Sequence, residues 1–333
     1  MDAQQLCFDG RVVKSYTVEL APPQGAQVLL RSEYSNVSIG TEIACIRHAR
    51  PEASPLWGLG YATVGTVEAV GLEACYRSGQ RVFAQPGHAA ASLVDGSAGA
   101  LTPVPDGLDP VVATLVALIG VGLHAVQRAR VNLNECAVVY GHGLVGAFAA
   151  QLLRRAGAGQ VVVVDPDPVR QALAQRLGAT RALGPEAAEL RGVLEELGHP
   201  DGADLVIEAA GHPSVFPRVF EALRIGGRLV CTSTFLSGLD VTLYPVVIEK
   251  ELTLIGAHGP KCPPRRVPYY PYSQSGNRGL AMDMLADGSL QTGGLITRCV
   301  AWQEAPALYE ELEGGHAILG AVIDWRDGTG IEA

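Results

Sequence analysis

The sequence contains no run of lysine or arginine, no CxxC pair and no uncharged apolar stretch of the roughly 18 residues that a membrane span requires. Acidic residues outnumber basic ones by 34 to 25, which gives a net charge of −9. Because nucleic acids and anionic membranes attract basic patches, we expect neither as a partner. The first ten residues, MDAQQLCFDG, have no basic segment followed by an apolar one, so we also expect no signal peptide.

The spacing of the cysteines argues against a disulfide framework. Seven cysteines stand at positions 7, 45, 75, 136, 231, 262 and 299, an odd number scattered along the chain. Such a distribution is typical of free thiols in a reducing compartment. We therefore predict a cytoplasmic protein.

The chain is long enough for two domains, with 48% apolar and only 18% charged residues among 333. Its first hundred residues contain short strand-like segments, such as AQVLLRSEYSNV, ATVGTVEAVG and QRVFAQ, between glycine, proline, aspartate and serine residues. This part of the sequence predicts a β-rich unit of barrel type.

The pattern changes at about Asp109. One helix-length segment, DPVVATLVALIGVGLHAVQRA, precedes apolar strands that alternate with helices, namely CAVVY, QVVVVD, ADLVIEAA, GRLVCTS and LTLIGAH. This alternation predicts a parallel sheet with helices on both faces, because strands that are apolar throughout are typical of sheets covered on both sides. After His258 the alternation stops, and we expect the C-terminal segment to rejoin the first unit.

The segment VVYGHGLVGAF places Gly141, Gly143 and Gly146 between an apolar strand and a helical pattern. In a dinucleotide-binding turn the first glycine permits the tight turn, the second lets the backbone approach the pyrophosphate, and the third lets helix and strand pack closely. The N-terminus of the helix then offers unpaired N–H groups to the phosphates. The spacing therefore predicts a dinucleotide site.

Asp165 ends the strand QVVVVD, nineteen residues after Gly146. A carboxylate at this place accepts hydrogen bonds from the ribose 2′-hydroxyl of NAD and repels the 2′-phosphate of NADP. NAD is the predicted cofactor, with NADP as the alternative because Arg170 is close enough to bind a 2′-phosphate. His142 has two interpretations, a functional side chain or one that points away from a loop whose backbone binds the cofactor.

Motifs along the whole chain resemble those of the medium-chain dehydrogenases/reductases, the zinc alcohol dehydrogenase superfamily. They are GYATVGTVEAVG, GQRVFA, GLHAVQRARV, the glycine turn, GADLVIEAAG and ALRIGGRLV. The resemblance implies an α/β fold with a GroES-like β-barrel domain, residues 1–112 and 259–333, and a doubly wound parallel-sheet (Rossmann) dinucleotide-binding domain, residues 113–258. It also implies a homodimer. The implied cofactor-binding residues are Gly141, His142, Gly143, Leu144, Val145, Gly146, Asp165, Arg170, Ala210 and Thr232.

One branch of the superfamily is more similar than the others. The segments SNVSIGTE and GYATVG, the GHG turn and the ending VIDWR are similar to 3-hydroxyethyl bacteriochlorophyllide dehydrogenases. The middle of the chain does not match that enzyme. The resemblance therefore extends to branch and type of reaction, and not to the substrate.

The zinc ligands of the superfamily are missing from this sequence. The positions that hold a cysteine, a histidine and a cysteine or glutamate in metal-using members fall at Ser38 or Ile39, at Tyr61 and near Ala117. A serine hydroxyl, a phenol and a methyl group do not replace the sulfur, nitrogen and carboxylate ligands that zinc requires. The sequence therefore predicts no metal.

Without a metal, a side chain must hydrogen-bond the substrate oxygen and relay its proton. Tyr61 stands where the histidine ligand would be and is either this group or a packed tyrosine. Thr41 matches the superfamily's serine or threonine that passes a proton towards the cofactor ribose. Glu42 matches an acidic residue often paired with an arginine beneath the metal, which favours a structural salt bridge, and Ser38 is a further polar candidate.

The segment KCPPRRVPYYPYSQSGNR lies where superfamily members line the substrate cleft or approach a partner subunit. Tyr269 and Tyr270, with Tyr272, form either an aromatic wall for a ring-bearing substrate or a dimer contact. Lys261 is either a group that receives an acidic part of the substrate or one in a solvated loop.

These observations predict a zinc-independent, NAD-linked alcohol dehydrogenase or ketone reductase. Its small-molecule substrate is a secondary alcohol or ketone on a cyclic or biosynthetic scaffold. Three alternatives stay open: an NADPH-dependent quinone or enoyl reductase, a redox epimerase that retains its cofactor, and a non-catalytic cofactor-binding protein.

Overall fold

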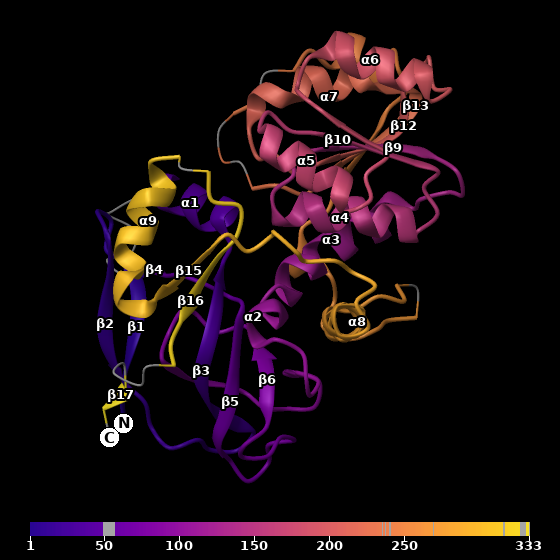
Figure 1. The fold of residues 1–333 in the computed structure, drawn as a ribbon. Coiled ribbons are helices and arrows are strands. Elements are labelled where there is room, and N and C mark those ends of the chain that lie inside the picture. Colours follow the sequence, from indigo (N-terminus) through magenta and orange to yellow (C-terminus); the bar gives the residue numbers. More distant parts are fainter. Residues whose placement is uncertain are drawn as a thin grey trace. The chain divides into compact units, whose positions relative to one another are not determined.

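The computed structural model describes residues 1–48, 57–234, 236, 238–239, 241–268, 270–315, 317–326 and 331–332 (Figure 1). The chain forms two units, Met1–Ala117 with Arg278–Ala333, and Leu118–Asn277. The sequence predicts these boundaries after residues 112 and 258. Segment 259–277 contacts the second unit, where Tyr270 packs edge-on against His124 and Asn277 accepts a hydrogen bond from Gln127.

The second unit is built on a six-stranded parallel sheet with the order β11-β10-β9-β12-β13-β14. This is the order of a doubly wound dinucleotide-binding sheet, with β9 as its first strand. The strands are β9 (Cys136–Tyr140), β10 (Gln160–Val164), β11 (Arg181–Leu183), β12 (Ala203–Glu208), β13 (Leu223–Cys231) and β14 (Thr253–Gly256).

Helices cover both faces of this sheet, with α4 and α5 on one side and α6 and α7 on the other (Figure 1). Strand residues such as Val138 and Val206 pack against Leu194 and Phe220 of the covering helices, which gives the unit its core. The helices are α3 (Val116–Ala129), α4 (Leu144–Arg155), α5 (Pro168–Arg176), α6 (Ala187–Glu196) and α7 (Phe216–Ala222), with short helical turns η1 (Pro213–Val215), η2 (Tyr244–Ile248) and η3 (Gly259–Lys261).

The first unit contains a seven-stranded mixed sheet with the order β15-β16-β3-β5-β6-β8, in which β7 also pairs with β3. A smaller sheet has the order β17-β1-β2, and β4 pairs with β1. The strands are β1 (Asp2–Phe8), β2 (Val13–Glu19), β3 (Gln27–Val37), β4 (Trp57–Gly58), β5 (Thr63–Val70), β6 (Arg81–Ala84), β7 (Ala91–Asp95), β8 (Thr102–Pro103), β15 (Arg298–Ala301), β16 (Ala321–Asp324) and β17 (Ile331–Glu332).

Strand β16 lies between β15 and β3, so the C-terminal segment completes the N-terminal sheet, as the sequence predicted. The helices of this unit are α1 (Ile39–His48), α2 (Pro110–Ala113), α8 (Gln274–Ala286) and α9 (Ala305–Glu313). Helix α8 starts before the unit boundary, and the short helical turn η4 (Trp302–Glu304) directly precedes α9. The single helix expected over DPVVATLVALIGVGLHAVQRA is in fact two, α2 and α3.

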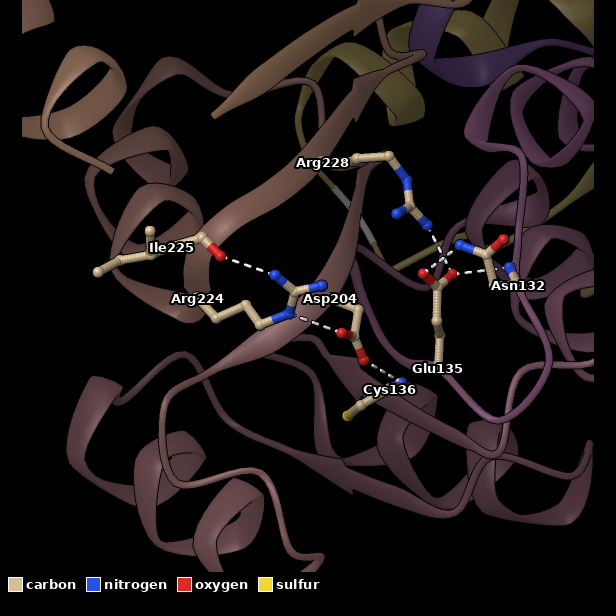
Figure 2. A network of polar contacts seen from close by, with 7 residues as sticks. All are labelled: Asn132, Glu135, Cys136, Asp204, Arg224, Ile225 and Arg228. Carbon is tan, nitrogen blue, oxygen red and sulfur yellow. Dashed lines mark hydrogen bonds and ion pairs between the residues drawn. The ribbon is translucent and has the colours of Figure 1, made fainter. Parts of the chain in front are cut away.

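Two arginine–carboxylate pairs tie the amino ends of the parallel strands together (Figure 2). Arg224 Nε lies 2.7 Å from Asp204, whose other oxygen accepts the N–H of Cys136 at 2.8 Å. Arg228 lies 2.5 Å from Glu135. These contacts join β9, β12 and β13 at the edge opposite to the glycine turn.

All seven cysteines are free thiols, as predicted. Among the described residues, every helix is too short or too polar to span a lipid bilayer.

Candidate active site

The hydroxyl groups of Ser38 and Tyr61 form a pair in the first unit. Ser38 follows the end of β3 and precedes α1, and the Tyr61 hydroxyl donates a hydrogen bond to Ser38 Oγ at 2.6 Å. Burial raises the pKa of Tyr61, and the charge of Glu42 adds to this, although hydrogen bonds with Ser38 and Thr41 act in the opposite direction. Tyr61 therefore keeps its proton at neutral pH. The structure thus brings together all four residues proposed for catalysis.

Glu42 lies beneath this pair, on the first turn of α1, and is buried. One carboxylate oxygen accepts the backbone N–H of Ser38 at 2.7 Å, and the other accepts the hydroxyl proton of Tyr309 on α9. His88 Nε2 lies 3.3 Å from the second oxygen. Among the described residues, the side-chain partners of the Glu42 carboxylate are therefore His88 and Tyr309, and not the arginine that the resemblance implies.

The orientation of His88 follows from its other neighbours. Its Nδ1 lies 2.8 Å from Ser35 Oγ, which also accepts the indole N–H of Trp325 at 2.8 Å. Because the indole can only donate, the hydroxyl proton of Ser35 is available for a hydrogen bond to Nδ1 of His88. Gly60, at φ 87°, passes so close that a Cβ there would lie 2.5 Å from the His88 ring.

The glycine turn in the second unit has the geometry of a phosphate-binding loop. Gly141 has φ 88°, and a Cβ on it would lie 2.7 Å from the Cα of Ala210. A Cβ on Gly146 would lie 1.9 Å from the carbonyl oxygen of Gly141. Gly143 starts α4 without a side-chain cap and faces open space. The first N–H groups of α4, from Leu144 and Val145, are therefore placed to receive an anion, and these residues fit a dinucleotide.

Asp165 directly follows β10 and is buried. Its carboxylate accepts the backbone N–H groups of His142 at 2.7 Å and Asp167 at 2.9 Å. Each oxygen keeps a second lone pair for a ribose hydroxyl. Arg170 lies 3.6 Å from Asp167. Burial lowers the pKa of His142 to about 4, so its fully buried imidazole is neutral.

Glu208, at the end of β12, is a site residue that sequence analysis missed. This fully buried carboxylate accepts the N–H groups of Ala210 at 2.9 Å and Gly211 at 2.8 Å and the hydroxyl proton of Ser233. Thr232 donates its backbone N–H to the carbonyl oxygen of Glu208. Glu208 thus fixes Ala210 and Thr232, two predicted cofactor residues. The acid at the end of the apolar segment ADLVIE was the available signal.

Lys261 and Tyr270, two of the four proposed substrate residues, line one pocket in the second unit, and a third, Tyr61, belongs to the hydroxyl pair of the first unit. Tyr269 lies outside the described residues. The ring of Tyr270 contacts that of Tyr272 edge-on, with 5.5 Å between the ring centroids.

Comparison with known families identifies the second unit. The profile of the family described as zinc-binding dehydrogenase matches residues 145–270. The predicted superfamily is thereby supported, and the match covers α4 and most of the doubly wound sheet.

Curated relatives match part of the chain. L-threonine 3-dehydrogenase of Shewanella sediminis is 31% identical over 157 residues, which cover 47% of this chain and 45% of that protein. A protein of Aspergillus clavatus assigned as D-xylulose reductase A is 29% identical over 231 residues, 67% of this chain and 60% of the other. The matched region thus spans about half of these relatives' length.

Solved structures match nearly all of the chain. A protein of Sinorhizobium meliloti assigned as a zinc-binding dehydrogenase and bound to NADP has a TM-score of 0.80 at 19% identity, covering 97% of this chain and 99% of its own. Galactitol-1-phosphate dehydrogenase of Escherichia coli has a TM-score of 0.79 at 19% identity, covering 96% and 99%. At such identities the likeness establishes the fold, and the predicted fold class is confirmed.

The family name implies zinc, but the side chains of this chain do not fit a zinc ion. The resemblance places the ligand positions at Ser38 or Ile39, at Tyr61 and near Ala117; the hydroxyl groups of Ser38 and Tyr61 are hydrogen-bonded to each other, and Ile39 and Ala117 offer only hydrocarbon. The described residues contain no group of three histidine, cysteine, aspartate or glutamate side chains that could hold a metal. Zinc prefers sulfur, imidazole and carboxylate ligands.

Proposed function

We propose that this protein is a zinc-independent oxidoreductase that moves a hydride between NAD(H) and a secondary alcohol or ketone on a cyclic or biosynthetic scaffold. The observation that carries the proposal is the hydrogen-bonded Ser38–Tyr61 hydroxyl pair, which the resemblance to the family leads us to align with its metal-ligand positions. The names of the relatives, a threonine dehydrogenase and a xylulose reductase, support an alcohol–ketone reaction.

When bound, the nicotinamide supplies the hydride acceptor or donor. The chain's own residues manage the proton that accompanies it. Tyr61 donates to Ser38, which leaves the Ser38 hydroxyl proton for the substrate oxygen. In reduction, Ser38 passes this proton to the substrate oxygen and takes the hydroxyl proton of Tyr61, and Tyr61 regains a proton from water through Thr41, its second hydrogen-bond partner; in oxidation, each transfer runs in reverse. Glu42 holds the backbone of Ser38 in place by accepting its N–H.

NAD is the proposed cofactor because of Asp165. A buried carboxylate beside the glycine loop offers lone pairs to a ribose 2′-hydroxyl, whereas a 2′-phosphate would meet its charge. NADP stays the alternative, since the Sinorhizobium neighbour is bound to it. The segments SNVSIGTE and VIDWR support the bacteriochlorophyllide-type branch as part of the same proposal.

A homodimer is also part of the proposal, with β14 as its contact. β14 is an edge strand, and large apolar side chains on and near it are exposed, including Tyr244, Ile248 and Leu254. Exposed edge strands offer unpaired N–H and C=O groups for pairing with a second copy. Size-exclusion chromatography with light scattering tests this: Leu254→Lys should yield monomers, and a monomeric wild type would contradict it.

The central experiment compares Ser38→Ala, Tyr61→Phe and the double variant with wild type. We first titrate NADH and NADPH by fluorescence, measure zinc, and screen cyclic secondary alcohols and ketones for turnover. Each single variant should bind NADH as wild type does and lose about 100-fold or more in turnover, the usual contribution of a proton-transferring group. Tyr16→Phe, a half-buried tyrosine in the same unit, is the control.

Two outcomes would overturn the proposal. Unchanged turnover in the double variant would remove the hydroxyl pair from the mechanism. Stoichiometric zinc in active protein would show that a metal, and not this pair, polarises the substrate oxygen.

A further inference from the structure

A large pocket lies at the carboxyl ends of β13 and β14, within the second unit. Its volume is about 820 Å³. It is lined by the residues that end and follow these strands, Cys231 to Thr234 and Gly256 to His258. The carboxyl edge of a doubly wound sheet is where ligands bind. The size of the pocket is within the range of small-molecule sites.

The charged side chains that line this pocket are all basic. Arg128 on α3 and Lys261 on η3 face it, together with His124 and His258, and no aspartate or glutamate lines it. Among the residues that the structure describes, neither Arg128 nor Lys261 forms an ion pair with a carboxylate. In a chain with net charge −9, this local excess of positive charge is a specific feature.

His124 forms a neutral wall of the pocket. Its side chain is buried, and its Nδ1 lies 3.3 Å from the Tyr270 hydroxyl. Burial lowers the pKa of His124, and the positive charges of Arg128 and His258 lower it further. The charge of Arg128 thus acts at His124, in the same pocket. The hydroxyl group of Thr234 adds a neutral hydrogen-bonding partner, whereas those of Thr232 and Ser233 donate to Ala257 and Glu208.

The phosphates of the dinucleotide are expected elsewhere. They belong at the N-terminus of α4, beside β9, where the glycine turn stands. In the sheet, β13 and β14 are the second and third strands from β9, so they lie roughly 10 and 14 Å from it at about 4.8 Å per strand. The basic pocket is thus displaced from the glycine turn towards the edge of the sheet.

We propose that this pocket binds an oxyanion group of the substrate, a carboxylate or a phosphate ester, through Arg128 and Lys261. The substrate class is then an anionic alcohol or ketone. This inference rests on the proposed hydride-transfer function for the role of the anion. The binding itself is measurable without turnover.

The test uses the full-length protein saturated with NADH. Inorganic phosphate and acetate are titrated at constant ionic strength, with NADH fluorescence and calorimetry as readouts, because the bound dinucleotide already occupies its own phosphate site. Arg128→Gln and Lys261→Gln are the variants. Arg265→Gln is the matched control, an exposed arginine close in sequence to Lys261 that does not line the pocket.

We expect one of the two anions to bind the NADH complex with a stoichiometry of one. Stronger binding of phosphate would indicate a phosphate ester in the substrate, and stronger binding of acetate a carboxylate. Each pocket variant should weaken the binding about tenfold or more, the cost of losing a charge-assisted contact, whereas Arg265→Gln should not. NADH affinity should stay unchanged in all three.

Three results would overturn the inference. The first is no anion binding to the NADH complex. The second is equal weakening by Arg265→Gln. The third is loss of NADH affinity in the pocket variants, which would assign the basic groups to the dinucleotide. Failure of NADH to bind the wild type would instead contradict the proposed function.

Discussion

Replacing Tyr309 with phenylalanine removes one hydroxyl from a side chain that is 1% exposed. That hydroxyl donates to the buried carboxylate of Glu42, and the phenyl ring keeps the packing of α9. Hydrogen bonds to charged groups contribute about 1.5–3 kcal/mol, so we expect the free energy of unfolding to fall by about 2 kcal/mol at pH 7. The backbone N–H of Ser38 and the nearby His88 stay in place as partners of Glu42.

The loss should depend on pH. Burial by itself raises the pKa of Glu42, but His88, the Tyr309 hydroxyl and the Ser38 N–H together hold it below the ordinary value. A carboxyl group with a lower pKa in the folded state gives stability that is present above its unfolded pKa and is lost as the pH falls through the folded value. The difference between wild type and Tyr309→Phe should therefore shrink below about pH 4.3, the unfolded value.

Urea unfolding followed by tryptophan fluorescence measures this directly. All three tryptophans, at positions 57, 302 and 325, belong to the unit that contains Glu42, so the signal reports that unit. Tyr16→Phe is the control for loss of a hydroxyl outside the buried cluster. A loss no larger than that of the control, or one that is the same at neutral and acidic pH, would contradict the assigned hydrogen bond between Tyr309 and Glu42.

Two further predictions concern the second unit. Gly146→Ala places a Cβ 1.9 Å from the carbonyl oxygen of Gly141, so this variant should have a lower melting temperature and no NADH binding. Gly143 faces open space, so Gly143→Ala should keep the melting temperature of wild type and only bind NADH more weakly. Equal melting temperatures of the two variants would contradict this prediction. Arg228→Met leaves Glu135 without its charged partner and should cost about 3–5 kcal/mol in urea unfolding followed by circular dichroism, most of it recovered by adding Glu135→Leu; no recovery would contradict the pairing.

The fold could be predicted from local patterns. The segments CAVVY, QVVVVD, ADLVIEAA, GRLVCTS and LTLIGAH became β9, β10, β12, β13 and β14, because each is apolar on both faces and bounded by glycine or polar residues. Helix α1 was not expected. The break between α2 and α3 was missed as well, because the segment DPVVATLVALIG is apolar and helix-like on both sides of it.

The candidate site could be predicted only in part. Ser38 and Tyr61 came from the family pattern, and the structure places their hydroxyl groups in contact. His88 and Tyr309 gave no signal, since a lone histidine in a loop and a tyrosine on the buried face of a helix fit ordinary packing. Tyr309 is 267 residues from Glu42, and only the return of the C-terminal segment brings them together.

That return has a consequence for the order of synthesis. Strand β16 fills the place between β15 and β3, and the chain that forms β3 leaves the ribosome almost three hundred residues before β16 does. Residues 118–277 are contiguous and complete their own sheet first. Until the last segment emerges, residues 34–37 of β3 lack their partner strand, and the nascent protein depends on its own charge, or on chaperones, to keep them from pairing with another chain.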